Sequence, residues 1–236
     1  MTTSTIRRLG VALTCVLALA VAGLALLHAR AGAARPAEPR ADGTVEIDAA
    51  TRRAGLRFAD GVGPEDRRWI LAAIDRARPH ARRLIAEVDG LVEIFAFTDP
   101  RSLSGGGSAL GITEAGPDGV RVGFDLPVLN GGRVSDRDST VLHELGHVLD
   151  FTLVRDDVRG QMDRLIPTGG PCAASEHTTG SCAAPEERFA DTFAKWSLHG
   201  AVSAFGAGYA VPTPASLEDW GAPLDRLALR LPPDAG

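Results

Sequence analysis

Apolar residues recur at helical spacing in four stretches of the chain. The longest covers residues 64–88 and begins with Pro64, a favoured first residue of a helix. We therefore predict a long N-terminal helix, which Pro79 should kink or split because proline removes a backbone donor. The same spacing predicts three further helices, at residues 136–153, 185–196 and 217–227.

Shorter apolar runs predict strands. Residues 91–97 form the clearest strand, and their near-continuous apolar character predicts burial on both faces. A short strand is expected at 55–58, and strands at 109–114 and 120–126 are joined by a Gly-Pro-Asp-Gly hairpin turn. Another turn is expected at residues 129–132. These elements predict one α+β domain with a small mixed sheet.

Residues 1–33 have the pattern of a targeting segment. Arg7 and Arg8 precede an uncharged apolar run at 11–27, and Ala-x-Ala cleavage sites follow it. The run is slightly long for a signal peptide and at the short limit of a membrane span. We therefore predict a cleaved signal peptide, with membrane anchoring through residues 11–27 as the alternative. Both interpretations place the protein outside the cytoplasm, secreted or extracytoplasmic.

The composition of the chain is that of a globular protein, with 44% hydrophobic and 23% charged residues. Residues 34–54 are rich in proline and charge near their start, which predicts a linker before a domain at residues 55–231. Three of the 25 basic residues lie in the leader, so the rest carries 22 basic and 30 acidic residues, a net charge of −8. Without a basic stripe and interleaved aromatic residues, we expect no nucleic-acid partner, and we expect a monomer.

Two of the three cysteines, Cys172 and Cys182, lie in the predicted domain. In an exported chain we expect them to form a disulfide bond. An alternative makes Cys172, His177 and Cys182 ligands of a second metal ion, but it lacks a fourth ligand nearby.

The motif H-E-x-x-H occupies residues 143–147 of the second predicted helix. Residues four apart share a helix face, so His143 and His147 can direct ring nitrogens to one point. Histidine nitrogens suit a Zn²⁺ ion. Glu144 can then act as a general base toward a water molecule at the metal.

A zinc site with two histidines needs another protein ligand. Asp150 is too close in register to His147 to serve easily, so we expect it to support a histidine or to cap the helix. We assign the third ligand to Glu187, because Asp191 one turn later can orient His143 or a water molecule. Glu186 is the alternative ligand, but no carboxylate follows it at i+4.

H-E-x-x-H followed by a helix with E-x-x-x-D resembles the glutamate-zincins, the thermolysin-like class of metallopeptidases. The segments H-E-L-G-H at 143–147 and E-R-F-A-D-T-F at 187–193 look most like the catalytic domain of anthrax lethal factor and its relatives. Those proteins carry H-E-F-G-H and E-F-F-A-E-A-F. The resemblance covers about residues 139–196 and implies a zincin-like domain with an H-E-x-x-H active-site helix and a C-terminal ligand-bearing helix. The residues it implies are the ligands His143, His147 and Glu187 for one zinc ion and the base Glu144.

The chain departs from the lethal-factor pattern at two points. Asp191 stands where those proteins have glutamate, and no tyrosine precedes the ligating glutamate, because the only tyrosine is Tyr209. A group that stabilises the oxyanion is therefore unassigned, and the candidates are His177, His199 and Tyr209. The resemblance also implies an edge strand for extended substrate beside the cleft, which we expect at residues 120–125.

The sequence therefore predicts an exported zinc endopeptidase that acts on a protein or peptide substrate. The alternative is a non-catalytic zincin-fold module that binds a partner at the cell surface. The sequence favours the enzyme, because Glu144 contributes little to zinc binding and is nevertheless present beside intact ligands.

Overall fold

The computed structural model describes six ranges of the chain, which are residues 54–98, 109–116, 119–132, 134–169, 179–202 and 210–232. All of them belong to one unit that spans residues 37–236. The predicted leader at 1–33 and nearly all of the predicted linker lie outside the described residues. So do Cys172, His177 and Tyr209.

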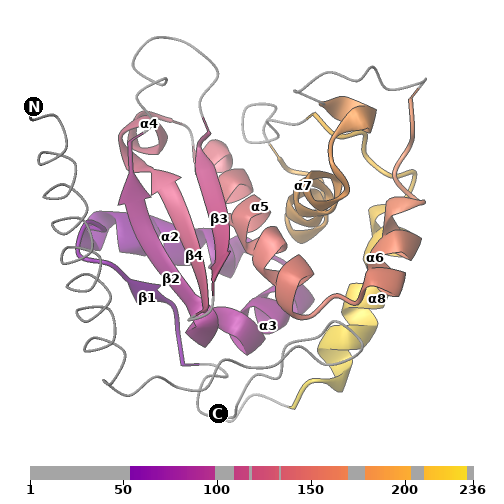
Figure 1. The fold of residues 1–236 in the computed structure, drawn as a ribbon, viewed down its shortest axis with the longest axis horizontal. Coiled ribbons are helices and arrows are strands. Elements are labelled where there is room, and N and C mark those ends of the chain that lie inside the picture. The colour runs from indigo at the N-terminus through magenta and orange to yellow at the C-terminus, as the bar shows by residue number, and fades with distance from the viewer. Residues whose placement is uncertain are drawn as a thin grey trace, which may run out of the picture. The chain divides into compact units, whose positions relative to one another are not determined.

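The described strands form one mixed sheet in the order β1-β2-β4-β3 (Figure 1). Strands β1, β2 and β4 are parallel, whereas β3 is antiparallel to β4. Together with the helices, this sheet confirms the predicted α+β class with a small mixed sheet. The strands are β1 Arg57–Phe58, β2 Val92–Phe97, β3 Gly111–Gly116 and β4 Gly119–Asp125.

The edge strand differs from the one that we expected. Residues 120–125 belong to β4, which pairs with β2 on one side and with β3 on the other, so the predicted edge position is wrong. Gly116 pairs with Gly119 across a two-residue loop, and this tight hairpin folds β3 back along the outer side of β4. Among the described strands, β3 is therefore the edge on this side of the sheet.

Strand β2 is buried on one face only. Val92 and Ile94 are buried, whereas Glu93, Phe95 and Phe97 are partly exposed. The prediction of burial on both faces is therefore wrong for β2. Phe95 and Phe97 make the sequence of this strand look continuously apolar. Their side chains nevertheless lie on the face opposite to Val92 and Ile94, as expected for a strand with one buried face.

The helices are α2 Pro64–Arg76, α3 Pro79–Val88, α4 Leu126–Gly131, α5 Val134–Thr152, α6 Asp156–Asp163, α7 Pro185–Ser197 and α8 Leu217–Arg230. Short 3-10 turns occur at Asp89–Leu91 and Gly180–Cys182. Pro79 splits the long N-terminal helix into α2 and α3, as predicted. Helix α4 ends at Gly131, within the turn predicted at residues 129–132. Asp125 caps its N-terminus, because its side chain accepts a hydrogen bond from the Val128 backbone N–H at 3.4 Å.

Helix α5 lies at the centre of the fold (Figure 1). It contacts the edge strand β3 and the helices α2, α3 and α7. Leu142, Leu145 and Leu149, which share the predicted apolar stripe, are buried. Packing on several sides excludes water from the polar residues of α5 as well, and this sets the environment of the candidate site.

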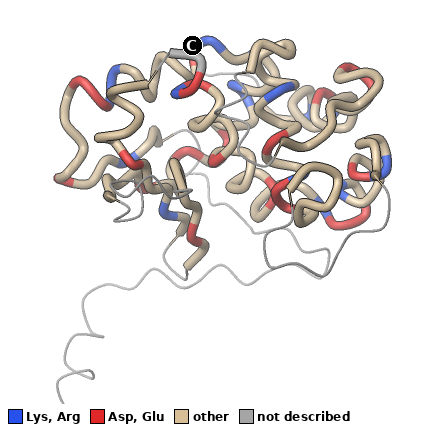
Figure 2. Tube along the Cα trace, turned by 90° about the horizontal axis from the view of Figure 1, so that it is seen from above, with Lys and Arg blue, Asp and Glu red and all other residues tan. Residues whose placement is uncertain are grey.

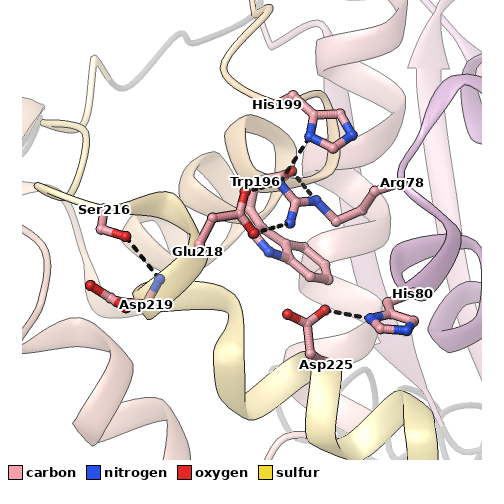
Figure 3. A network of polar contacts seen from close by, with 8 residues as sticks. All are labelled: Arg78, His80, Trp196, His199, Ser216, Glu218, Asp219 and Asp225. Atoms are coloured by element: carbon pink, nitrogen blue, oxygen red, sulfur yellow. Dashed lines mark hydrogen bonds and ion pairs between the residues drawn. The ribbon is translucent and has the colours of Figure 1, made fainter.

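The C-terminal end of α7 is held by Arg78, which lies between α2 and α3 (Figure 3). The buried Arg78 guanidinium donates to the Trp196 carbonyl oxygen at 2.6 Å and stacks over the Trp196 ring, 4.5 Å from its centroid. It also donates to both carboxylate oxygens of Glu218 on α8, at 2.8 and 3.0 Å. A cation at the C-terminal end of a helix is favourable because the last carbonyl groups are partly negative. Arg78 thus joins the N-terminal helices to α7 and α8.

Charged residues of both signs are interspersed along the described chain (Figure 2). Many of them pair across elements, for example Arg76 with Asp138 and Arg188 with Asp163. Within the described ranges no helix has the length and apolar character needed to cross a membrane. The predicted anchor at residues 11–27 lies outside those ranges.

Candidate metal centre

Helix α5 presents the two histidines of the motif on one face. His143 and His147 are both buried, and their ring centroids are 4.9 Å apart with the planes at 82°. The ring of Phe151, one turn further along α5, stacks on His147 at a centroid distance of 6.0 Å. Phe151 is itself exposed. The i, i+4 spacing therefore brings both imidazoles to one place, as predicted.

Helix α7 brings Glu187 to these histidines because α5 and α7 approach closely at Gly146. A Cβ atom added to Gly146 would lie 3.0 Å from the Ala190 Cα atom and 3.2 Å from the Phe193 ring. Such contacts leave little room for a larger side chain, so the glycine inside H-E-L-G-H permits this helix packing. The importance of Gly146 was missed in the sequence, although a glycine in mid-helix was a signal of a packing or functional role.

The ligand atoms of His143, His147 and Glu187 lie within 4.8 Å of one another, so these three residues could hold a metal ion. The Glu187 Oε2 atom is 3.1 Å from His143 Nε2 and 3.3 Å from His147 Nε2. Neighbouring ligand atoms of a tetrahedral site with bonds of 2.0–2.1 Å are roughly 3.3 Å apart. The two spacings to Glu187 therefore match two edges of such a site. Glu186, the alternative ligand, is exposed and is not part of this group.

The charges of the cluster shift the pKa values of its members. Burial alone would raise the pKa of Glu187, but hydrogen bonds from His143 and His147 and the charges of these rings lower it to about 2. Burial lowers the pKa of His143, yet its hydrogen bond with Glu187 and the charges of Glu144, Glu187 and Asp191 raise it above its ordinary value. Both shifts favour an imidazolium–carboxylate pair when protons, instead of a metal, neutralise the cluster.

For protein stripped of metal by a chelator, we expect this cluster to stabilise the fold most between pH 4.5 and pH 6.5, the ordinary pKa values of glutamate and histidine. The folded pKa of Glu187 is lowered, so its contribution is present above pH 4.5 and is lost as the pH falls toward about 2. The folded pKa of His143 is raised, so its contribution is present below pH 6.5 and is lost as the pH rises through the raised value. Melting temperatures of the wild type and of Glu187→Gln, both without metal and measured from about pH 3 to about pH 8, check this expectation. Identical pH profiles for the two proteins would contradict it.

Asp191, predicted to orient His143, is buried one turn after Glu187 on α7. Its charge acts on His143 and contributes to the raised pKa of that ring. Its Oδ2 atom lies 2.5 Å from Nζ of Lys195, the only lysine of the chain, which also donates to the Val211 carbonyl oxygen. The buried cation keeps Asp191 from being an unpaired buried charge.

Asp150 has a similar position behind His147. It is buried on α5, it interacts electrostatically with His147, and its Oδ2 atom accepts a hydrogen bond from Arg159 on α6 at 3.0 Å. Burial raises the pKa of Asp150 in spite of Arg159. Each histidine thus has a carboxylate near it that is itself paired with a cation. The Nδ1 atom of His147 and the Oδ1 atom of Asp150 are buried without a hydrogen-bond partner in the described part of the chain.

Glu144, the predicted base, is buried between α5 and the edge strand. Its Oε2 atom accepts a hydrogen bond from the Thr113 hydroxyl on β3 at 2.7 Å. A Cβ atom added to Gly111, two residues earlier on β3, would lie 2.4 Å from Glu144 Oε1. These two β3 residues were missed in the sequence, because contacts between a strand and a helix carry no local spacing signal.

The candidate oxyanion stabilisers are not brought to this group by the described structure. His199 follows the C-terminal end of α7, where its Nδ1 atom is 3.3 Å from Arg78 (Figure 3). Glu187 lies twelve positions earlier, which corresponds to about 18 Å along a helix. His177 and Tyr209 lie outside the described residues.

The second metal site considered for Cys172, His177 and Cys182 falls largely outside the described residues. Cys182 lies in the 3-10 turn Gly180–Cys182 just before α7. Because Cys172 is not described, its pairing with Cys182 stays a prediction.

No family model, no curated protein and no solved structure matches this chain. The function proposed below therefore rests on the side chains and the geometry described above.

Proposed function

We propose that this protein is an exported zinc-dependent metallopeptidase of the zincin type. The observation that carries the proposal is the convergence of His143, His147 and Glu187 on one point, with Glu144 beside them and held by a different element. The two histidines are buried and Glu187 is half-buried, and a metal ion would satisfy the ligand atoms that they direct toward one another. Three protein ligands would leave a coordination position open, and the neighbouring Glu144 suits catalysis there.

Zinc is the metal that this set of donors favours. Two imidazole nitrogens and one carboxylate oxygen are the ligand set of catalytic zinc sites, which keep a further position open for water or substrate. The spacings of 3.1 and 3.3 Å between the ligand atoms fit a tetrahedral ion. A zinc ion bound here would supply Lewis acidity toward a scissile carbonyl group and toward a water molecule.

Glu144 provides the proton transfers of the proposed reaction. As a general base, its carboxylate accepts a proton from the attacking water molecule, and it then donates that proton to the leaving amine. Glu144 is next to the ligand His143 on α5, and it is buried, so little bulk water competes for its carboxylate. Glu187 and the two histidines would have no part in proton transfer, because their electron pairs bind the metal.

The edge strand supports a peptide as the substrate. The Asp125 backbone N–H donates to the Leu110 carbonyl oxygen at 3.0 Å. In an antiparallel pair only every second residue forms backbone hydrogen bonds with its partner strand, so counting from Leu110 these are the even-numbered residues of β3. The backbone groups of Gly111 and Thr113 then point away from β4, toward the open edge beside Glu144. An extended peptide that paired with this edge would place its backbone next to the base.

Metal removal tests the proposal. We expect the purified domain to cleave members of a random quenched-fluorescence peptide library, to lose this activity with 1,10-phenanthroline, and to regain it with about one equivalent of zinc per chain. Bound zinc without any cleavage would instead favour the non-catalytic binding module at the cell surface. Cleavage that survives complete metal removal would contradict the proposal.

A further inference from the structure

Glu144 occupies a position that two residues of the edge strand shape. Side chains two apart on a strand share a face, and Gly111 and Thr113 both direct this face of β3 toward α5. We call these two residues the Glu144 cradle. The cradle lies on a different element from the metal ligands, so β3 as well as α5 determines where the Glu144 carboxylate lies.

Thr113 supplies the polar half of the cradle. Its hydroxyl lies 2.7 Å from Glu144 Oε2 and 3.2 Å from the Glu144 carbonyl oxygen, and with one proton it can donate to only one of them at a time. The shorter distance and the charge of the acceptor favour the carboxylate. This hydrogen bond leaves Oε1 as the oxygen without a bond to Thr113.

Gly111 supplies the steric half of the cradle. A Cβ atom at this position would lie 2.4, 2.5 and 2.7 Å from the Oε1, Cγ and Cδ atoms of Glu144. No real side chain tolerates such distances, so alanine at position 111 would force the carboxylate to move. Gly116 on the same strand is a suitable control, because among the described residues a Cβ atom there would meet only the Gly119 carbonyl oxygen, at 3.8 Å.

We propose that Gly111 and Thr113 hold the Glu144 carboxylate in place, which makes Thr113 a positioning residue for the base and requires glycine at position 111. This inference rests on the proposed function for its catalytic consequence only. The base then has a fixed direction before substrate arrives, so no rotamer search is needed in the proton-transfer step. The cradle also couples the base to β3, the strand proposed to bind the peptide.

A thermal unfolding cycle tests the cradle without any activity assay. Gly111→Ala should lower the melting temperature of the chain by roughly 2–10 °C, because the new methyl group and Glu144 compete for one space. In a Glu144→Ala background the same substitution should change it by no more than about 1 °C, since the clash is gone. Gly116→Ala should have the same small effect in both backgrounds. Equal losses from Gly111→Ala in both backgrounds would overturn the cradle.

Kinetics test the positioning role of Thr113. Thr113→Val keeps the shape of the side chain but cannot donate, so we expect kcat to fall roughly 10- to 100-fold, with KM and zinc content unchanged. Thr113→Ser should restore most of the rate because it restores the donor. An unchanged kcat in Thr113→Val would overturn the positioning role. If the wild-type chain cleaves no peptide, the proposed function fails, whereas the unfolding cycle still decides the cradle.

Discussion

Replacing Glu144 with glutamine is expected to lower kcat for peptide hydrolysis by roughly 10²- to 10⁴-fold, the contribution that general acid–base catalysis typically makes. Glutamine has nearly the same size as glutamate, so it should fit beside Gly111 and still accept the Thr113 hydrogen bond through its carbonyl oxygen. It cannot accept a proton from water at neutral pH. The variant should therefore fold and bind zinc as the wild type does.

Peptide cleavage and zinc content measured on the same preparations of Glu144→Gln and wild type check this expectation. A variant with retained zinc and lost cleavage separates the base from the ligands. If Glu144→Gln cleaves as fast as the wild type, Glu144 is not the base. If it loses zinc, the residue has a part in metal binding that its position toward β3 does not predict.

Replacing Glu187 with alanine should have the largest effect on metal binding. Loss of a group that merely supports a ligand typically costs 10- to 100-fold in metal affinity, and loss of a ligand should cost at least about 100-fold. Two histidines on one helix would remain, without the carboxylate that both of them contact at 3.1 and 3.3 Å. Zinc binding and peptide cleavage should therefore both be lost.

The neighbouring residue gives a matched control for this change. Glu186 is exposed and is not one of the three candidate ligands, so Glu186→Ala removes the same charge from the same turn of α7 without removing a ligand. Zinc titrations of both variants, followed by calorimetry, distinguish them. Weakened binding in Glu186→Ala and unchanged binding in Glu187→Ala would reverse the assignment of the third ligand.

The parts of the site that local spacing determines could be predicted from the sequence. The i, i+4 pair His143 and His147 needs only the helical repeat, and the pair Glu187 and Asp191 was found in the same way. Pro185 and Pro79 marked the start of α7 and the break before α3, because proline restricts the backbone wherever it occurs.

The parts that depend on contacts between distant elements could not be predicted. Strand β4 pairs with the distant strand β2 as well as with β3, and this long-range pairing makes β3 the edge in place of β4. The cradle of Glu144 exists only because β3 then lies beside α5. The pairing of Lys195 with Asp191 inside the fold is a further example. Such partners depend on tertiary packing, for which a single sequence has no periodic signal.

The central claim is that His143, His147 and Glu187 bind a zinc ion. X-ray absorption at the zinc edge of the purified domain tests it most directly, because it measures the distances from the metal to its ligands. We predict about one zinc ion per chain, with histidine nitrogens at roughly 2.0–2.1 Å and carboxylate or water oxygens at roughly 2.0–2.2 Å. A sulfur shell at about 2.3 Å, or protein that folds and binds no zinc, would contradict the claim.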